Sequence, residues 1–144
     1  MLWPDHCVQG TRGCEIHEEV NAALDKRRRN GDPGFVEIIQ KGQDPKVDGY
    51  SAFSKNSYVS FTPLVRKLAA RGIERVFVVG LATDYCCHAS ALDARKFGFE
   101  TIIVKNAMKG VDAEGSKAAI EELQKWGCIA VDGADDALKV LAGA

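Results

Sequence analysis

The chain has 144 residues, of which 46% are hydrophobic and 27% charged, and its formal net charge at pH 7 is −1. This composition is typical of globular proteins, and the length predicts a single domain over residues 1–144 with a buried core. The charge gives no electrostatic basis for binding nucleic acid or an anionic membrane. No apolar run approaches the roughly eighteen residues that a membrane span needs, and no signal peptide is predicted.

The number and spacing of cysteines and histidines indicate the cellular compartment and whether a metal site is present. An odd number of cysteines, without the spacing of a disulfide framework, indicates reduced thiols in a cytoplasmic protein. Among the histidines His6, His17 and His88, no two lie at the spacing of paired metal ligands, so the sequence alone contains no complete metal site. The cysteines are Cys7, Cys14, Cys86, Cys87 and Cys128.

The first part of the chain alternates between loops and two predicted elements. Residues 1–15 are punctuated by proline and glycine and predict a loop. A helix is predicted over 16–29 from its apolar spacing, and a strand over 35–40, FVEIIQ, after a turn at 32–34. The polar segment 42–57, GQDPKVDGYSAFSKNS, is longer than most loops that merely connect two elements. It therefore predicts a functional loop.

The second part of the chain alternates between apolar strands and helices. Strands bare of polar residues between helices indicate a parallel sheet covered on both faces, and therefore a three-layer α/β/α fold. Ligand sites in such sheets form outside the carboxyl ends of the strands, where Lys41, residues 81–86 and residues 105–110 fall. Strands are predicted at 76–80, 101–105 and 128–132, and helices at 62–71, 85–98, 114–127 and 134–142.

Two adjacent cysteines, Cys86 and Cys87, lie where the strand 76–80 passes into the following helix. Backbone N–H groups and the positive end of the helix dipole favour a thiolate at that place, and the thiolate is the nucleophilic form. The same N–H groups can hold an oxyanion during attack on a carbonyl. From position alone, the alternative is that both are small buried hydrophobes, as unpaired cysteines often are.

Three stretches of the sequence together resemble one family. VVGLATDYC with the following ALDA is similar to the nucleophile motif of nicotinamidases, within the isochorismatase-like cysteine hydrolases. LWPDHCVQGTRG at 2–13 resembles the histidine loop of that family, and QKGQDPKVDGYSAF at 40–53 resembles its lysine loop. The resemblance covers the chain from Leu2 to about Asp132 and implies the isochorismatase-like fold.

The resemblance implies a role for each matching residue near the nucleophile. Cys86 matches the nucleophile, and Lys41 matches the lysine whose cation favours the thiolate of a nearby thiol. The peptide bond between Leu81 and Ala82 matches one that is cis in the family, where it directs the N–H groups of Ala82 and Cys86 at the substrate oxygen. Cys87 falls where the family has an aliphatic residue and is expected to pack.

The resemblance also implies a substrate and a metal. Trp3 and Tyr50 match aromatic residues that sandwich a pyridine ring, while Phe53 either completes the wall or packs in the core. His6 matches one ligand of the family's divalent metal, which is zinc, iron or manganese. Asp84 is expected to cap the helix through the amides of Cys86 and Cys87.

The implied reaction converts the small-molecule substrate nicotinamide and water to nicotinate and ammonia. The cysteine forms a thioester with the acyl group, and a metal-activated water releases nicotinate from it. His17 and His88 match no family residue and are expected to be exposed.

Several parts of the family pattern have no counterpart in this chain: the first two strands, the catalytic aspartate and an Asp-x-His metal-binding pair. Asp132 lies at a strand end, but its strand belongs to the far side of the family's sheet, so we do not expect it to substitute. We therefore expect a domain incomplete at its amino end, impaired activity, a metal that is lost or weakly bound, and a bare apolar edge along strand 76–80.

Two alternatives remain open. The chain is either a non-catalytic fragment or isoform that associates with a full-length subunit, or another amidohydrolase of the same superfamily acting on carbamoyl or pyrazine amides. A homo-oligomer is compatible with each of these functions.

Overall fold

The computed structural model describes residues 3–30 and 36–143. The chain divides into two compact units, Met1–Ile38 and Ile39–Ala144. Among the helices in these described ranges, none has the length and apolar character needed to cross a membrane.

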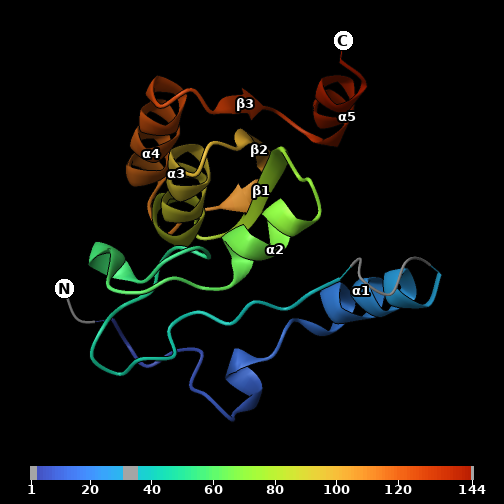
Figure 1. The fold of residues 1–144 in the computed structure, drawn as a ribbon. Coiled ribbons are helices and arrows are strands. Elements are labelled where there is room, and N and C mark those ends of the chain that lie inside the picture. Colours follow the sequence, from blue (N-terminus) through green and yellow to red (C-terminus); the bar gives the residue numbers. More distant parts are fainter. Residues whose placement is uncertain (1–2, 31–35, 144) are drawn as a thin grey trace. The chain divides into compact units, whose positions relative to one another are not determined.

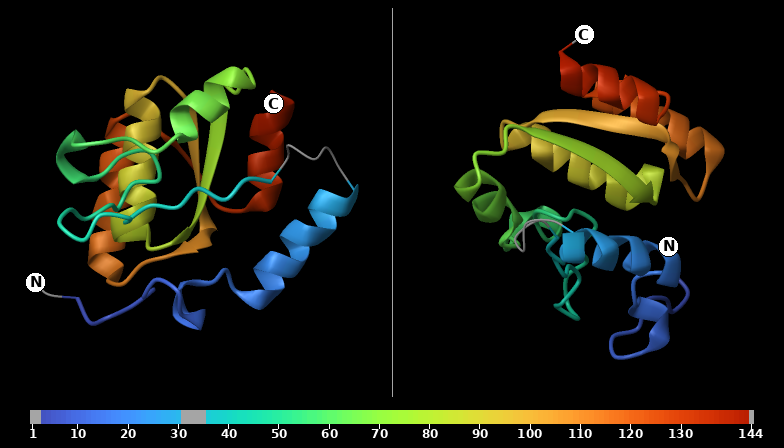
Figure 2. Two further views of the ribbon diagram at one scale, coloured as in Figure 1. Left: turned by 60° about the horizontal axis from the view of Figure 1, so that its bottom comes forward. Right: turned by 90° about the vertical axis from the view of Figure 1, so that its right-hand side faces the viewer.

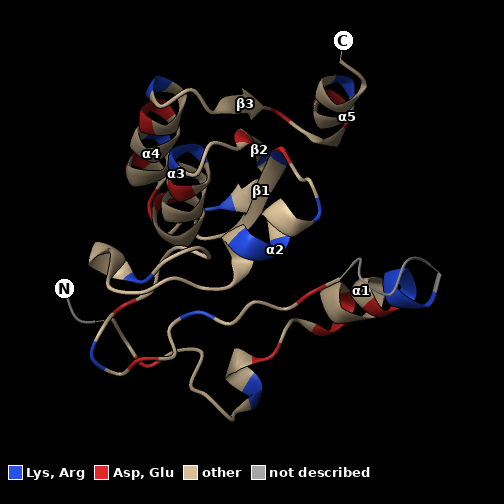
Figure 3. Ribbon diagram, viewed as in Figure 1, with Lys and Arg blue, Asp and Glu red and all other residues tan. Residues whose placement is uncertain are grey.

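The first unit contains a short 3₁₀ turn, η1 (Arg12–Cys14), and one helix, α1 (Glu18–Asn30). The helix predicted over 16–29 is confirmed with its start two residues later. Its first turn is acidic and its last turn basic, as the red and blue ends of α1 in Figure 3 show. Charges placed in this order stabilise a helix through its dipole. The turn predicted at 32–34 lies outside the described residues.

The second unit is built on three parallel strands in the order β1 (Arg75–Leu81), β2 (Glu100–Lys109) and β3 (Ile129–Val131) (Figure 1). The predicted parallel sheet is confirmed. β2 runs to Lys109, so the loop expected at 105–110 is instead mostly strand, and that expectation was wrong. The reason is a bulge: Val78 pairs with Ile103 but Gly80 pairs with Met108, and β2 carries the extra residues.

Side chains alternate between the two faces of this sheet, as strand geometry requires. On one face Ile103 packs with Ala91 of α3 (His88–Lys96) and Leu123 of α4 (Ala113–Lys125). On the other face Ile102 and neighbouring valines pack against α5 (Ala134–Ala142). The right-hand view of Figure 2 shows α5 on the opposite side of the strands from α3 and α4. The predicted three-layer α/β/α architecture is therefore confirmed.

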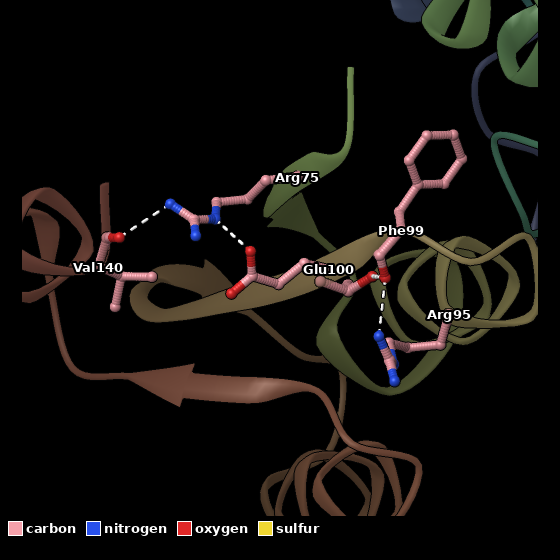
Figure 4. A network of polar contacts seen from close by, with 6 residues as sticks. Arg75, Arg95, Phe99, Glu100 and Val140 are labelled. Atoms are coloured by element: carbon pink, nitrogen blue, oxygen red, sulfur yellow. Dashed lines mark hydrogen bonds and ion pairs between the residues drawn. The ribbon is translucent and has the colours of Figure 1, made fainter. Parts of the chain in front are cut away.

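A polar link reinforces the packing of α5 on the sheet. Arg75 of β1 donates from Nη1 to the carbonyl oxygen of Val140, 2.8 Å away, and from Nε to the carboxylate of Glu100 on β2 (Figure 4). One guanidinium thus joins two strands and the last helix, in a geometry that its rigid fork of donors allows.

The strand predicted over 35–40 was wrong for the described residues 36–40, which are not in a strand. A strand exists through hydrogen bonds to a neighbour, and β2 is the only described strand that pairs with β1. β1 therefore lies at an edge, where Val79 is 56% and Leu81 73% exposed. The bare apolar edge expected for this strand is present in the described part of the chain.

The polar segment 42–57 is mostly irregular, as predicted, and ends in a short turn, η2 (Asn56–Tyr58). The helix α2 (Leu64–Ala70) follows Thr62 and Pro63. Phe53, at the end of the YSAF stretch, is buried with Ala94 and Phe99. This burial fastens the segment to α3, the helix that begins just after Cys86.

Candidate active site

The strand-to-helix turn that carries Cys86 has an unusual backbone. β1 ends at Leu81, the peptide bond between Leu81 and Ala82 is cis, and one π-helical turn, η3 (Thr83–Cys87), leads into α3. The carbonyl oxygen of Ala82 accepts from the N–H groups of Tyr85 and Cys87, at 3.1 and 3.0 Å. The predicted helix is thus present, but its first turn is wider than an α-helical turn.

The structure brings Lys41 and Cys86, which are 45 positions apart, into contact. Lys41 Nζ lies 3.3 Å from Cys86 Sγ and donates a second hydrogen bond to the carbonyl oxygen of Gly49, at 2.9 Å. The sulfur therefore has a cationic group within hydrogen-bond distance, which is an arrangement found beside cysteine nucleophiles. Cys86 is half-buried, so its sulfur is held by the protein without being sealed in the core.

Cys87, the neighbouring cysteine, has the opposite environment. It is 4% exposed, and burial raises the pKa of its thiol to about 11. A thiol of this kind stays protonated at neutral pH and is a poor nucleophile. Its burial agrees with the packing role expected for Cys87.

Asp84 does not cap the helix through the amides of Cys86 and Cys87, so this expectation was wrong. Its carboxylate oxygens instead accept from the backbone N–H groups of Val111 and Asp112, at 3.0 and 2.9 Å. Burial raises the pKa of Asp84, but these two hydrogen bonds, together with one from its own backbone N–H, outweigh burial and hold the pKa below its ordinary value. Asp84 therefore fastens the turn before Cys86 to the loop that precedes α4.

The aromatic residues predicted to bind substrate have different surroundings. Tyr50 is half-buried, and its ring centroid lies 5.9 Å from that of Tyr85, at the turn that carries Cys86. Trp3, in the first unit, makes an edge-on contact with His6, with ring centroids 6.2 Å apart. Phe53 is 4% exposed and packs in the core, which is the second of the two alternatives given for it.

The residues present do not fit the divalent metal of the family. His6 Nδ1 lies 2.8 Å from the carbonyl oxygen of Pro4. Across residues 3–30 and 36–143, no three His, Cys, Asp or Glu side chains are grouped so that they could hold an ion. We therefore assign no step of the chemistry to a metal on this chain.

Two further polar residues have partners of their own. Asp132 lies 2.6 Å from Lys105 Nζ. His88 is half-buried, and its Nε2 atom lies 3.1 Å from the carboxylate of Glu122 on α4, so the expectation that it is exposed was wrong. His17 is exposed, as expected.

The buried carboxylate of Asp93 on α3 was not predicted from the sequence. Asp93 of α3 is 4% exposed and accepts hydrogen bonds from Ser54 and Tyr58. A signal was available, because Asp93 stands in the stretch ALDA beside two alanines on the buried side of the helix. A carboxylate in that position needs partners from another segment.

Comparison with known proteins supplies the family. The model of the isochorismatase domain matches residues 2–135, which is most of the chain. The chain belongs to the isochorismatase-domain family. A nicotinamidase of Acinetobacter baylyi is 40% identical to it over 116 residues, which cover 81% of this chain and 50% of that protein.

Solved structures of isochorismatase-like proteins agree with this assignment. Yeast nicotinamidase bound to the inhibitor nicotinaldehyde superposes with a TM-score of 0.82 at 25% identity, covering 92% of this chain and 59% of that one. The pyrazinamidase of Pyrococcus horikoshii, solved in complex with zinc, gives a TM-score of 0.72 at 36% identity, covering 91% of this chain and 63% of that one. The chain thus spans about half the length of the curated relatives it matches.

Proposed function

We propose that this chain carries the cysteine and the lysine of a nicotinamidase active site, with Cys86 as the nucleophile and Lys41 as the cation that contacts its sulfur. The contact of 3.3 Å between Lys41 Nζ and Cys86 Sγ is the observation that carries the proposal. Membership of a family in which several matched relatives are named nicotinamidases supports the choice of substrate.

The reaction would proceed in two steps on these residues. Cys86 Sγ attacks the carboxamide carbon of nicotinamide, while the N–H groups of Ala82 and Cys86 hold the negative carbonyl oxygen. The carbon–nitrogen bond breaks, and the nitrogen takes a proton from Lys41 and leaves as ammonia. Water then hydrolyses the thioester to nicotinate, which restores the thiolate; one proton returns to Lys41 and a second converts ammonia to ammonium.

A flat ring is the substrate that the aromatic residues near Cys86 favour. Tyr50 and Tyr85 lie with their ring centroids 5.9 Å apart, on the lysine loop and on the nucleophile turn respectively. Aromatic side chains bind flat rings by stacking or edge contacts. The presence of these rings supports an amide carried on a pyridine or pyrazine ring over an aliphatic amide.

The rate on this chain is a separate question from the identity of the reaction. No residue of the chain matches the family's catalytic aspartate, and a general base typically contributes about two to four orders of magnitude in rate. We therefore propose that turnover is slower by roughly this factor than in relatives that have the aspartate. A chain with no turnover would instead be the non-catalytic fragment considered above.

The test is hydrolysis of nicotinamide by the purified chain, with nicotinate measured by chromatography and ammonia by a coupled assay. Both products should form in equal amounts and disappear in Cys86→Ser, whereas Cys14→Ala, which alters an exposed thiol elsewhere, should keep the rate. Equal turnover by Cys86→Ser and the unmodified chain would overturn the proposal. Faster hydrolysis of pyrazinamide or of an N-carbamoyl amide would move the substrate to another amide of the superfamily.

A further inference from the structure

The buried carboxylate of Asp93 joins α3 to the segment that carries the lysine. Its Oδ2 atom accepts from Ser54 Oγ at 2.6 Å, and its Oδ1 atom accepts from Tyr58 OH at 2.8 Å. Tyr58 OH in turn accepts from Lys96 Nζ, at 2.6 Å, one turn further along α3. Burying a carboxylate is costly unless its oxygens are hydrogen-bonded, so this network is satisfied only while residues 54–58 stay against the helix.

Two more contacts hold the same part of the loop on α3. Ser90 Oγ accepts from the N–H of Ala52 at 2.9 Å, and Phe53 packs against Ala94 in the core. Ser90, Asp93 and Ala94 thus bind three consecutive residues of the loop, 52–54. The loop is fixed to α3, the helix that directly follows the π-helical turn carrying Cys86.

The fixed part of the loop in turn holds the part that carries Lys41. The N–H of Asn56 donates to the carbonyl oxygen of Asp48 at 2.8 Å, and Lys55 Nζ lies 3.0 Å from Asp44. Gly49, next to Asp48, supplies the carbonyl oxygen that receives Lys41 Nζ at 2.9 Å. An unbroken series of short contacts therefore runs from Asp93 to the ammonium beside Cys86.

We propose that Asp93 is a positioning residue of the active site: by holding Ser54 and Tyr58 on α3, it sets the contact between Lys41 Nζ and Cys86 Sγ. The proposal rests on the proposed function, in which Lys41 activates Cys86. Asp93 touches neither the sulfur nor the lysine and acts only through the loop. Without Asp93, both groups would still be present, but the distance between Lys41 Nζ and Cys86 Sγ would no longer be fixed.

The experiment measures the rate at which iodoacetamide alkylates Cys86, divided by the rate for the exposed Cys14 in the same molecule, by peptide mass spectrometry. Asp93→Asn should lower this ratio about tenfold, and Tyr58→Phe, which removes one oxygen from a 45% exposed side chain, about threefold. Tyr58→Phe keeps the test decisive if Asp93→Asn does not fold.

A matched control separates positioning from stability. Leu123→Ala removes a fully buried side chain from the cluster around Ile103, away from the loop, and should destabilise the protein without changing the ratio. An equal fall of the ratio in Leu123→Ala, or no fall in folded Asp93→Asn and Tyr58→Phe, would overturn the positioning role.

Lys41→Met distinguishes this proposal from the one on which it rests. It should lower the ratio at least as much as Asp93→Asn does, because it removes the cation itself. If Lys41→Met leaves the ratio unchanged, activation by Lys41 is wrong, and the role of Asp93 fails with it. If Lys41→Met lowers the ratio and the Asp93 and Tyr58 variants do not, the positioning role alone is wrong.

Discussion

Cys86 and Cys87 are adjacent in the chain and differ in almost every physical property. Cys86 is half-buried with an ammonium group 3.3 Å from its sulfur, while Cys87 points into the core and is 4% exposed. Cys128 resembles Cys87, because burial raises its pKa to about 11 as well. One step along a helical turn points the next side chain in a different direction, which suffices to move it from the half-buried surface into the core.

We expect the two buried thiols to make stability depend on pH. In the unfolded chain Cys87 and Cys128 ionise near pH 9, whereas in the folded chain burial holds both pKa values at about 11. The unfolded state therefore loses protons first, and the free energy of unfolding, fully retained below pH 9, falls as the pH rises towards 11. Urea unfolding at pH 7, 9 and 10.5 measures this fall.

Lysines and tyrosines also titrate in this range, so the control is the double variant Cys87→Ala/Cys128→Ala. Its stability should decline less steeply above pH 9 than that of the unmodified chain. Identical slopes would show that burial of these thiols does not set the pH dependence.

At the scale of elements, the turn η3 is held by the start of α4 as well as by its own backbone. Asp84 in η3 accepts hydrogen bonds from the N–H groups of Val111 and Asp112, and we call this pair of hydrogen bonds the Asp84 clamp. Gly110 lies directly against the clamp. A Cβ atom on Gly110 would lie 1.8 Å from Ser116 Oγ and 3.0 Å from Asp84 Oδ1. Only glycine fits at this position without movement of the clamp.

Gly110→Ala should therefore destabilise the protein by about 1–3 kcal/mol, the usual cost of forcing atoms into a packed site. Ser116→Ala in the same chain removes the closest clashing atom and should recover part of the loss. Gly13→Ala is the matched control, since the nearest atom to its Cβ is Thr11 Oγ1 at 3.4 Å, an ordinary contact. Urea denaturation measures all three, and equal stability of Gly110→Ala and Gly13→Ala would contradict the clamp.

At the scale of the whole molecule, the relatives exceed this chain in length and one of them was solved with zinc. His6 is the metal ligand that the family resemblance predicts, and residues 3–30 and 36–143 contain no group of three His, Cys, Asp or Glu side chains able to hold an ion. One imidazole binds zinc far more weakly than three or four ligands together.

We therefore expect that dialysis against EDTA changes neither the melting temperature nor the alkylation of Cys86, and that equimolar zinc does not raise the melting temperature. Linkage predicts a rise of several degrees for tight binding to the folded state alone. The Pyrococcus horikoshii pyrazinamidase is the positive control for metal content. Retention of one zinc ion per chain after dialysis would show that a complete site exists.

The order and type of most elements from residue 62 onward could be predicted from the sequence, because periodicity and the glycine and proline stops are local properties. The strand 76–80, the helix after Tyr85 and the parallel sheet all follow from such patterns. The place of Cys86 at a strand-to-helix turn follows from them as well. Local patterns could not link Lys41 to Cys86; the family resemblance predicted that the two act together.

Only the tertiary structure decided which groups meet. The contact between Lys41 and Cys86 spans 45 positions and that between Asp93 and Ser54 spans 39, and no local pattern encodes such pairs. Residues 36–40 have a strand-like sequence and form no strand, because pairing depends on a neighbour as much as on the segment itself. Local propensity chooses the elements, while packing and long-range hydrogen bonds choose the partners from which a site is built.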